Sequence, residues 1–120
     1  MKSSTTLNLD TYSCKLVICV TDQLKCESKK ICKKYKVSID DDTEDEGIFI
    51  PTDDMKVYFL LIDLKYLSHN TIAHEIYHAT IGITEDRGVN DEEAQSWLCG
   101  HITGTVYKFL DKKKFKIKHG

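Results

Sequence analysis

The sequence contains no long hydrophobic run. Its longest apolar stretch is VYFLLI at residues 57–62, whereas a membrane-spanning helix needs about 20 apolar residues. The N-terminal residues 1–13 are polar and lack the apolar segment of a secretory signal peptide. These absences predict a protein that is neither exported nor inserted in a membrane, and we expect it in the cytoplasm.

The cysteines do not form the pattern of a disulfide framework. Their number is odd, and no two of them make a Cys-x-x-Cys pair; they are Cys14, Cys19, Cys26, Cys32 and Cys99. Because the chain also lacks an export signal, we predict that all of them are reduced thiols.

A strong excess of one charge sign is also missing. The formal net charge is only −2 although 30% of the residues are charged, so the composition predicts neither nucleic acid nor a membrane surface as a partner. The acidic run DDDTEDE at 40–46 and the basic tail at 111–120 are interpreted as a solvated loop and a solvated tail.

The length of 120 residues suffices for one domain with a modest core and no disulfides. No repeat or linker divides the chain, so we predict a single domain over 1–120 that begins with a polar segment, 1–13. Hydrophobic periodicity predicts the order β-α-β-β-α-α, which is the α+β class. The predicted elements are a strand at 15–21, a helix at 22–37 capped by Asp22, strands at 47–51 and 55–63, a helix from Ser68 to a C-cap at Gly82, and a helix at 91–110.

The predicted last helix has a broad apolar face. This face comprises Ala94, Trp97, Leu98, Ile102, Thr105, Val106 and Phe109. Gly100 and Gly104 lower helix stability, so their presence predicts close approach to another helix or strand.

The most informative motif is HEIYH at residues 74–78. His74 and His78 are four residues apart, so they lie on one face of a helix, opposite the aliphatic stripe that contains Ile72 and Ile76. Two imidazoles so placed can bind one metal ion with Glu75 beside them as a general base, which is the spacing of zinc metallopeptidases.

A catalytic zinc takes three protein ligands and leaves one position open. The spacing alone does not identify the third ligand. The candidates are His69, His101, Glu85, Asp86, Glu92, Glu93 and the cysteines. Glu93 also has capping-box spacing from Asn90, which is the alternative reason for a glutamate there.

The arrangement HEIYHAT…DEEAQSWLCGHIT resembles small zincin-type metallopeptidase-like proteins that bacteriophages and related mobile elements often encode. It is also similar to minimal gluzincins, and the resemblance covers roughly residues 48–106. It implies a minimal zincin-like domain, in which a small sheet packs against the His-Glu-x-x-His helix and a following glutamate-bearing helix.

The resemblance further implies that His74, His78 and Glu93 bind Zn²⁺ and that Glu75 is the general base. The second helix lacks the Asn-Glu-x-x-Ser-Asp pattern of larger gluzincins, so Glu92 stays an alternative to Glu93. Glu93 shares a helix side with Trp97 and Gly100, and we expect this side to approach the motif helix.

These observations predict a zinc-dependent peptidase that uses a metal-activated water on a peptide or protein substrate. The strand KVYFLLID, residues 56–63, is expected to border the cleft and to pair with extended substrate. One alternative is a catalytically latent zincin-like domain that binds zinc and acts as a protein-interaction module. A second alternative is a small α+β interaction protein that binds no metal.

Overall fold

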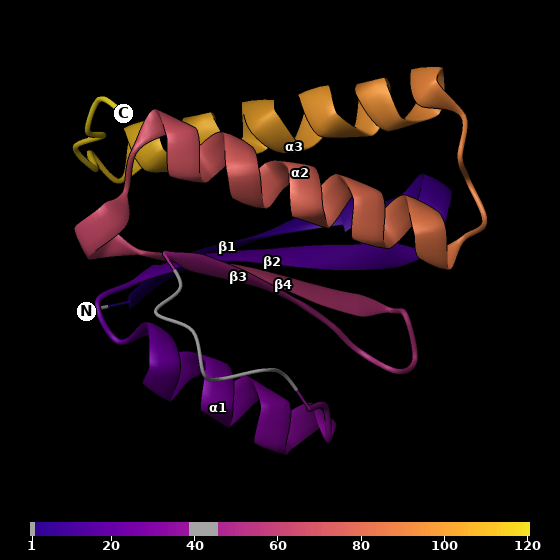
Figure 1. Ribbon diagram of the computed structural model, residues 1–120, viewed down its shortest axis with the longest axis horizontal. Helices are drawn as coiled ribbons and strands as arrows, with labels where there is room; N and C mark the ends of the chain where they lie inside the picture. The colour runs from indigo at the N-terminus through magenta and orange to yellow at the C-terminus, as the bar shows by residue number, and fades with distance from the viewer. Residues whose placement is uncertain (1, 39–45) are drawn as a thin grey trace.

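The chain forms a sheet with helices on both of its faces (Figure 1). The computed structural model describes residues 2–38 and 46–120. The strands are β1 (Lys2–Leu9), β2 (Cys14–Thr21), β3 (Gly47–Pro51) and β4 (Val57–Asp63), and the helices are α1 (Leu24–Tyr35), α2 (His69–Asp86) and α3 (Glu92–Lys112). The order in the sheet is β1-β2-β4-β3, with β2 and β4 parallel and the other pairs antiparallel. The predicted α+β class is confirmed.

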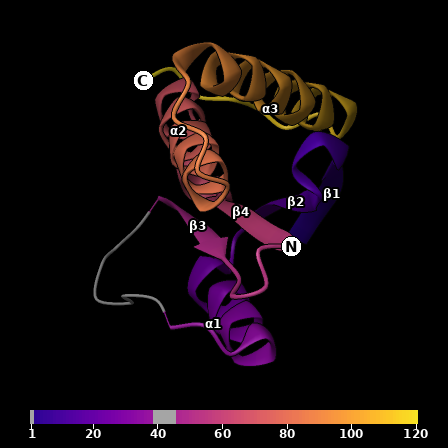
Figure 2. The same ribbon diagram turned by 90° about the vertical axis from the view of Figure 1, so that its right-hand side faces the viewer.

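The alternation of side chains along the two central strands divides the core between the faces of the sheet. Helices α2 and α3 cover one face and α1 covers the other (Figure 2). The sheet residues of the larger cluster include Leu16, Ile18, Val20, Tyr58, Leu60 and Ile62. The smaller cluster comprises Cys19, Leu24, Ile50, Phe59 and Leu61. Both central strands are therefore buried on both faces, as their runs of apolar residues indicate.

The polar segment 1–13 is not an unstructured leader, because most of it forms strand β1. It pairs with β2 in a register that runs from Lys2 opposite Thr21 to Leu9 opposite Cys14. Exposed positions alternate along β1 with less exposed ones, which are occupied by Ser3, Thr5, Leu7 and Leu9. The strand was not predicted from the sequence, because serine and threonine occupy inward positions where aliphatic residues are expected.

Helix α2 begins as predicted and ends later than predicted. Ser68 is its N-cap, and the Ser68 side chain accepts a hydrogen bond from the backbone amide of Thr71. The predicted aliphatic stripe is buried. Gly82, however, lies inside the helix rather than at its C-cap, which is Arg87. A Cβ at Gly82 would stand 2.4 Å from Cε2 of Phe49, so this glycine allows close contact between α2 and β3.

The predicted N-cap of the first helix, Asp22, is wrong by one residue, and the capping box considered as an alternative role of Glu93 does not form. The N-cap of α1 is Gln23, because the Thr21 hydroxyl already accepts from the Gln23 amide and the helix begins after it. The N-cap of α3 is Asp91, whose carboxylate accepts from the Ala94 amide, so the capping box through Asn90 is not formed.

The outer side of α3 differs from the prediction. Trp97 is 72% exposed rather than part of the core, while Leu98, Ile102, Val106 and Phe109 are buried. Gly100 and Gly104 have no neighbouring atom within 4 Å of a Cβ position, so the close approach expected there does not occur among the described residues. No helix among the described residues has the length and apolar character needed to cross a membrane.

The contact between Gly82 and Phe49 is testable by adding one methyl group. Alanine raises helix propensity by about 1 kcal/mol over glycine, yet at Gly82 it must displace an aromatic ring. We therefore expect Gly82→Ala to lower the free energy of unfolding by about 1–3 kcal/mol, as in other overpacked sites. The matched control, Gly100→Ala, meets no neighbour and should be stabilising. Urea denaturation of dilute protein measures both, and equal effects would contradict this packing.

Candidate metal centre

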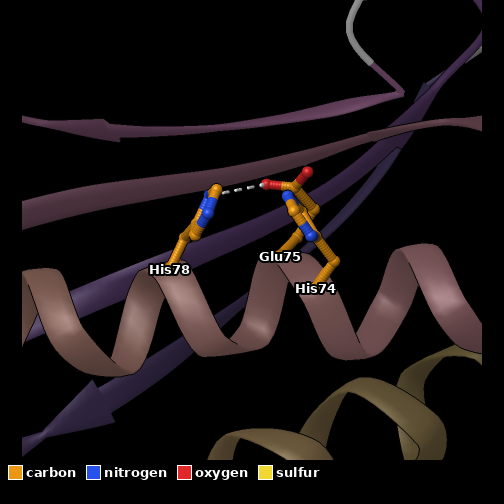
Figure 3. Close-up of side chains that lie close together, drawn as sticks. All are labelled: His74, Glu75 and His78. Atoms are coloured by element: carbon orange, nitrogen blue, oxygen red, sulfur yellow. Dashed lines mark ion pairs between the residues drawn. The ribbon is translucent and has the colours of Figure 1, made fainter.

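Three side chains of α2 form the candidate metal centre, and they project from the same side of the helix (Figure 3). One possible ligand atom from each of His74, Glu75 and His78 lies within 4.8 Å of the others. The two imidazole rings are 4.4 Å apart between centroids and are tilted by 59°. The sequence prediction that these three residues cluster is thus confirmed.

The helix sets this arrangement. Positions 74 and 78 are one helical turn apart, and the buried stripe of Ile72, Ile76 and Ala79 fixes the rotation of α2 against the sheet. Both histidines are consequently exposed, whereas Glu75 lies at the boundary of the core and is buried.

Glu75 is enclosed between the helix and the first residue of β3. It is only 5% exposed, and its Oε1 lies 3.7 Å from Nδ1 of His78. A Cβ at Gly47 would stand 2.7 Å from Cγ of Glu75. Glycine at position 47 is therefore required for this carboxylate to lie against the sheet. Sequence reasoning missed Gly47, because its role depends on strand pairing and not on local spacing.

The three residues open into a hollow of about 440 Å³ between α2 and β3. Its lining comprises Gly47, Ile48 and Phe49 from β3 and His74, Glu75, Tyr77, His78, Ile81, Gly82 and Glu85 from α2. Apart from the centre itself and Glu85, the hollow is mainly apolar. This composition and the adjoining strand edge suit an extended chain that carries apolar side chains.

The strand that borders the hollow is β3 and not the predicted KVYFLLID segment. Strand β4, which contains most of that segment, lies between β2 and β3 and has no free edge. The prediction was wrong because β4, although it packs against α2, pairs with β2 on one side and with β3 on the other. In the sheet, β3 turns back antiparallel to β4 and takes the edge position on the side of α2.

A hydrogen-bond network anchors the beginning of β3 to the first turn of α2. The Thr71 hydroxyl donates to Oε2 of Glu46 at 2.7 Å, and the Ser68 hydroxyl donates to the Thr71 hydroxyl at 3.1 Å. The Glu46 carbonyl also accepts from the Asp63 amide. Glu46 was predicted only as part of the acidic loop 40–46, the rest of which lies outside the described residues. It connects β3, β4 and α2 immediately before Gly47.

A second network holds the other end of α2. The buried Tyr58 hydroxyl donates to Oδ2 of Asp86 at 2.7 Å and accepts from Arg87. Arg87 also donates to the backbone carbonyls of Tyr12 and Met55. Burial, followed by the hydrogen bond to Asp86, raises the pKa of Tyr58 above its ordinary value. Asp86 is thus engaged with Tyr58, which makes it a structural residue and not a metal ligand.

The remaining candidate ligands do not join the group. His69 stacks on Tyr107 and lies 2.8 Å from its hydroxyl through Nδ1. Glu85 lines the hollow but is seven residues beyond His78, which corresponds to about 10 Å along the helix. None of the cysteines belongs to the group, and all five are unpaired as predicted.

Glu93 and Glu92 lie on α3, outside the group. Both are exposed, and Glu93 lines a different hollow together with Trp97 and His101. The expected approach of this helix side to α2 is wrong, because Trp97 is exposed and Gly100 has no neighbour. The assignment of Glu93 as third ligand therefore stays a prediction that rests on the resemblance alone.

The donor set fits a metal ion. Zinc bonds to imidazole and carboxylate are about 2.0–2.2 Å long, so two ligands of one ion lie at most about 4.4 Å apart. The separations here, all within 4.8 Å, come close to that range. Imidazole suits zinc, copper, iron and nickel, so the geometry defines a possible metal site without identifying the ion.

Comparisons with protein-family models, with curated proteins and with solved structures gave no match. The likeness to zincins consequently rests on the His-Glu-x-x-His spacing, whose residues lie close together in the structure.

The two histidines should be individually required for metal binding. We expect His74→Ala and His78→Ala each to weaken zinc or cobalt binding by at least about 10-fold, because each removes one donor from a small ligand set. His101→Ala, on the neighbouring helix, is the matched control and should bind as the wild type does. Isothermal titration measures all three, and equal affinities would remove the proposed centre.

A separate pair of variants tests the third ligand. In the structure Glu93 points into another hollow, so we expect Glu93→Ala to retain the metal affinity of the wild type, as should Glu92→Ala. The resemblance instead predicts loss of binding by orders of magnitude for Glu93→Ala alone. The same titration separates the two, and a selective loss would show that α3 supplies a ligand.

Proposed function

We propose that the protein is a zinc-dependent peptidase. The observation that carries this proposal is the cluster of His74, Glu75 and His78 at the edge of a hollow beside strand β3. Two imidazoles one helical turn apart, with a carboxylate beside them, are the groups that metal-assisted hydrolysis by a His-Glu-x-x-His site requires.

His74 and His78 would hold the ion through their imidazole nitrogens. Zinc, when bound, polarises a carbonyl group and makes a water molecule acidic near neutral pH. The buried carboxylate of Glu75 accepts a proton from the attacking water as its oxygen bonds to the carbonyl carbon. Glu75 then delivers that proton to the nitrogen when the carbon–nitrogen bond breaks. The products are a carboxylic acid and an amine, so one water is consumed for each peptide bond.

The substrate would lie extended along the outer edge of β3. This edge strand has one neighbour in the described sheet, β4, so its other side presents backbone amides and carbonyls to a peptide. Ile48, Phe49 and Ile81 line the adjoining hollow. A peptide with an apolar side chain beside the cleaved bond would match this surface.

A zinc-binding domain without peptidase activity is the second candidate. The position of Glu93 favours this candidate. Glu93 lies outside the group, so among the described residues Glu75 is the only carboxylate that joins the two histidines. If Glu75 is itself the third ligand, no general base remains in the group. The domain would then act as a protein-interaction module that zinc stabilises.

The variant Glu75→Gln separates the two candidates. Glutamine keeps the shape of the side chain but cannot accept a proton, so for a peptidase we expect zinc binding to be retained and the turnover number to fall by about 10²–10⁴-fold. Glu92→Gln, an exposed change on α3, is the control. Peptide cleavage and zinc titration are measured on the same preparations.

Each result has one interpretation. Loss of cleavage with retained zinc supports the peptidase. Loss of zinc makes Glu75 a ligand and supports the second candidate. Equal cleavage by the wild type and Glu75→Gln contradicts the proposed role of Glu75.

A further inference from the structure

The outward side of α3 carries a line of residues that the domain itself does not use. We call Glu93, Trp97, Gly100, Gly104 and Lys108 the outer face of α3; their spacings of three and four residues place them on one side of the helix. All of them are exposed. The opposite side of α3 packs into the core through Leu98, Ile102 and Val106, and α3 lies on the outside of the helical layer (Figure 2).

Trp97 is the most unusual residue of this face. It is the only tryptophan of the chain, and 72% of it is exposed. It borders a hollow of about 560 Å³ whose lining residues, Glu93, Ser96, Trp97, Gly100 and His101, all belong to α3. Tryptophan buries more apolar area than other side chains and is enriched at the centres of protein interfaces. Its exposure beside a hollow therefore points to contact with another surface.

The two glycines of the outer face indicate what kind of surface this is. Glycine destabilises the interior of a helix, and nothing in the described chain approaches Gly100 or Gly104 closely enough to require it. The absence of side chains leaves a shallow notch over the helix backbone. Such a notch fits a large side chain from a second helix, in the manner of a knob entering a hole.

The charges at the two ends of the face match each other. Glu93 stands before Trp97, and Lys108 stands after Gly104. Within the described part of the chain, neither side chain takes part in an ion pair or a hydrogen bond. When the partner is a second copy of the same helix, the acid of one copy meets the base of the other only if the two helices run in opposite directions.

We propose that the outer face of α3 is a homodimer interface in which two copies of α3 pack antiparallel. With a two-fold axis near Gly100 and His101, each residue n faces residue 201 − n of the second copy. Glu93 then faces Lys108 of the second copy, and Trp97 faces Gly104 of the second copy. A two-fold axis repeats every such contact, so each dimer has two ion pairs and two tryptophans seated in glycine notches.

A second copy explains the face better than an unrelated partner does. When two copies of α3 pack in this one register, Trp97 meets the glycine notch and Glu93 meets Lys108. The inference is independent of metal binding, because His74 and His78 lie on α2 and contribute nothing to this face. Failure of the peptidase proposal would leave it unchanged.

Sedimentation and tryptophan fluorescence of the intact chain test the dimer. We expect wild-type protein to associate to a dimer as its concentration rises from micromolar to submillimolar. Because Trp97 is the only tryptophan, the protein's tryptophan emission should shift to shorter wavelength over the same range. Iodide should also quench this emission less, because the indole becomes less accessible. A monomer at all concentrations, or a dimer in which Trp97 stays equally accessible, would overturn the proposal.

Variants locate the interface. Trp97→Ala and Gly104→Leu should each raise the dimer dissociation constant by about 30-fold or more. Leucine is a better helix former than glycine, so Gly104→Leu should also raise the thermal midpoint of the dilute monomer, which excludes misfolding as the cause. Tyr66→Ala, at an exposed aromatic elsewhere, is the control and should leave the dissociation constant unchanged.

A charge exchange tests the register. Glu93→Lys and Lys108→Glu should each weaken the dimer, since each brings like charges together in both ion pairs. The double variant should recover most of the wild-type affinity. A double variant that is no tighter than either single variant would refute the antiparallel register.

Discussion

The close packing of α2 against the edge strand β3 is the contact on which the rest of the site depends. Two glycines make it possible: Gly82 accommodates the ring of Phe49, and Gly47 accommodates the side chain of Glu75. Phe49 in turn stacks on Tyr58, with the rings 5.7 Å apart between centroids. If α2 stood farther from the sheet, Glu75 would be exposed and the hollow would be wider and more hydrated.

Hydrogen-bond networks at both ends of α2 keep this contact in place. The Ser68–Thr71–Glu46 network joins the start of the helix to the residue before β3. At the other end, Arg87 and Tyr58 join the helix to the sheet and to the loop after β1. The bonds of Glu46, Asp86 and Arg87 in these networks are partly buried and charge-assisted, which makes them stronger than average, so they oppose rotation or translation of α2. The positions of His74 and His78 follow from this restraint.

The sequence predicted those features that depend on local spacing. The grouping of His74, Glu75 and His78 follows from one helical turn, and the cap at Ser68 follows from the residue type. The roles of Gly47 and Gly82 depend on which strand occupies the sheet edge, which no local pattern encodes. Strand β1 was missed because Ser3 and Thr5 interrupt its apolar alternation. Trp97 was assigned with Leu98 to one broad apolar face, yet a helix turns by about 100° between neighbours and only Leu98 faces inward.

The burial of Glu75 gives the site its chemical character. A carboxylate between two exposed imidazoles attracts a cation more strongly than it would in open solvent, because nearby protein lowers the local dielectric response. In the proposed peptidase, the same buried carboxylate would take the proton of the attacking water. The proposed function requires a metal ion at His74 and His78, and the binding of this ion is the central claim.

Elemental analysis of protein purified without a histidine tag tests that claim most directly. The account predicts about one zinc per chain, or full loading after zinc is added to metal-free protein. A metal content near zero that added zinc does not restore would contradict it.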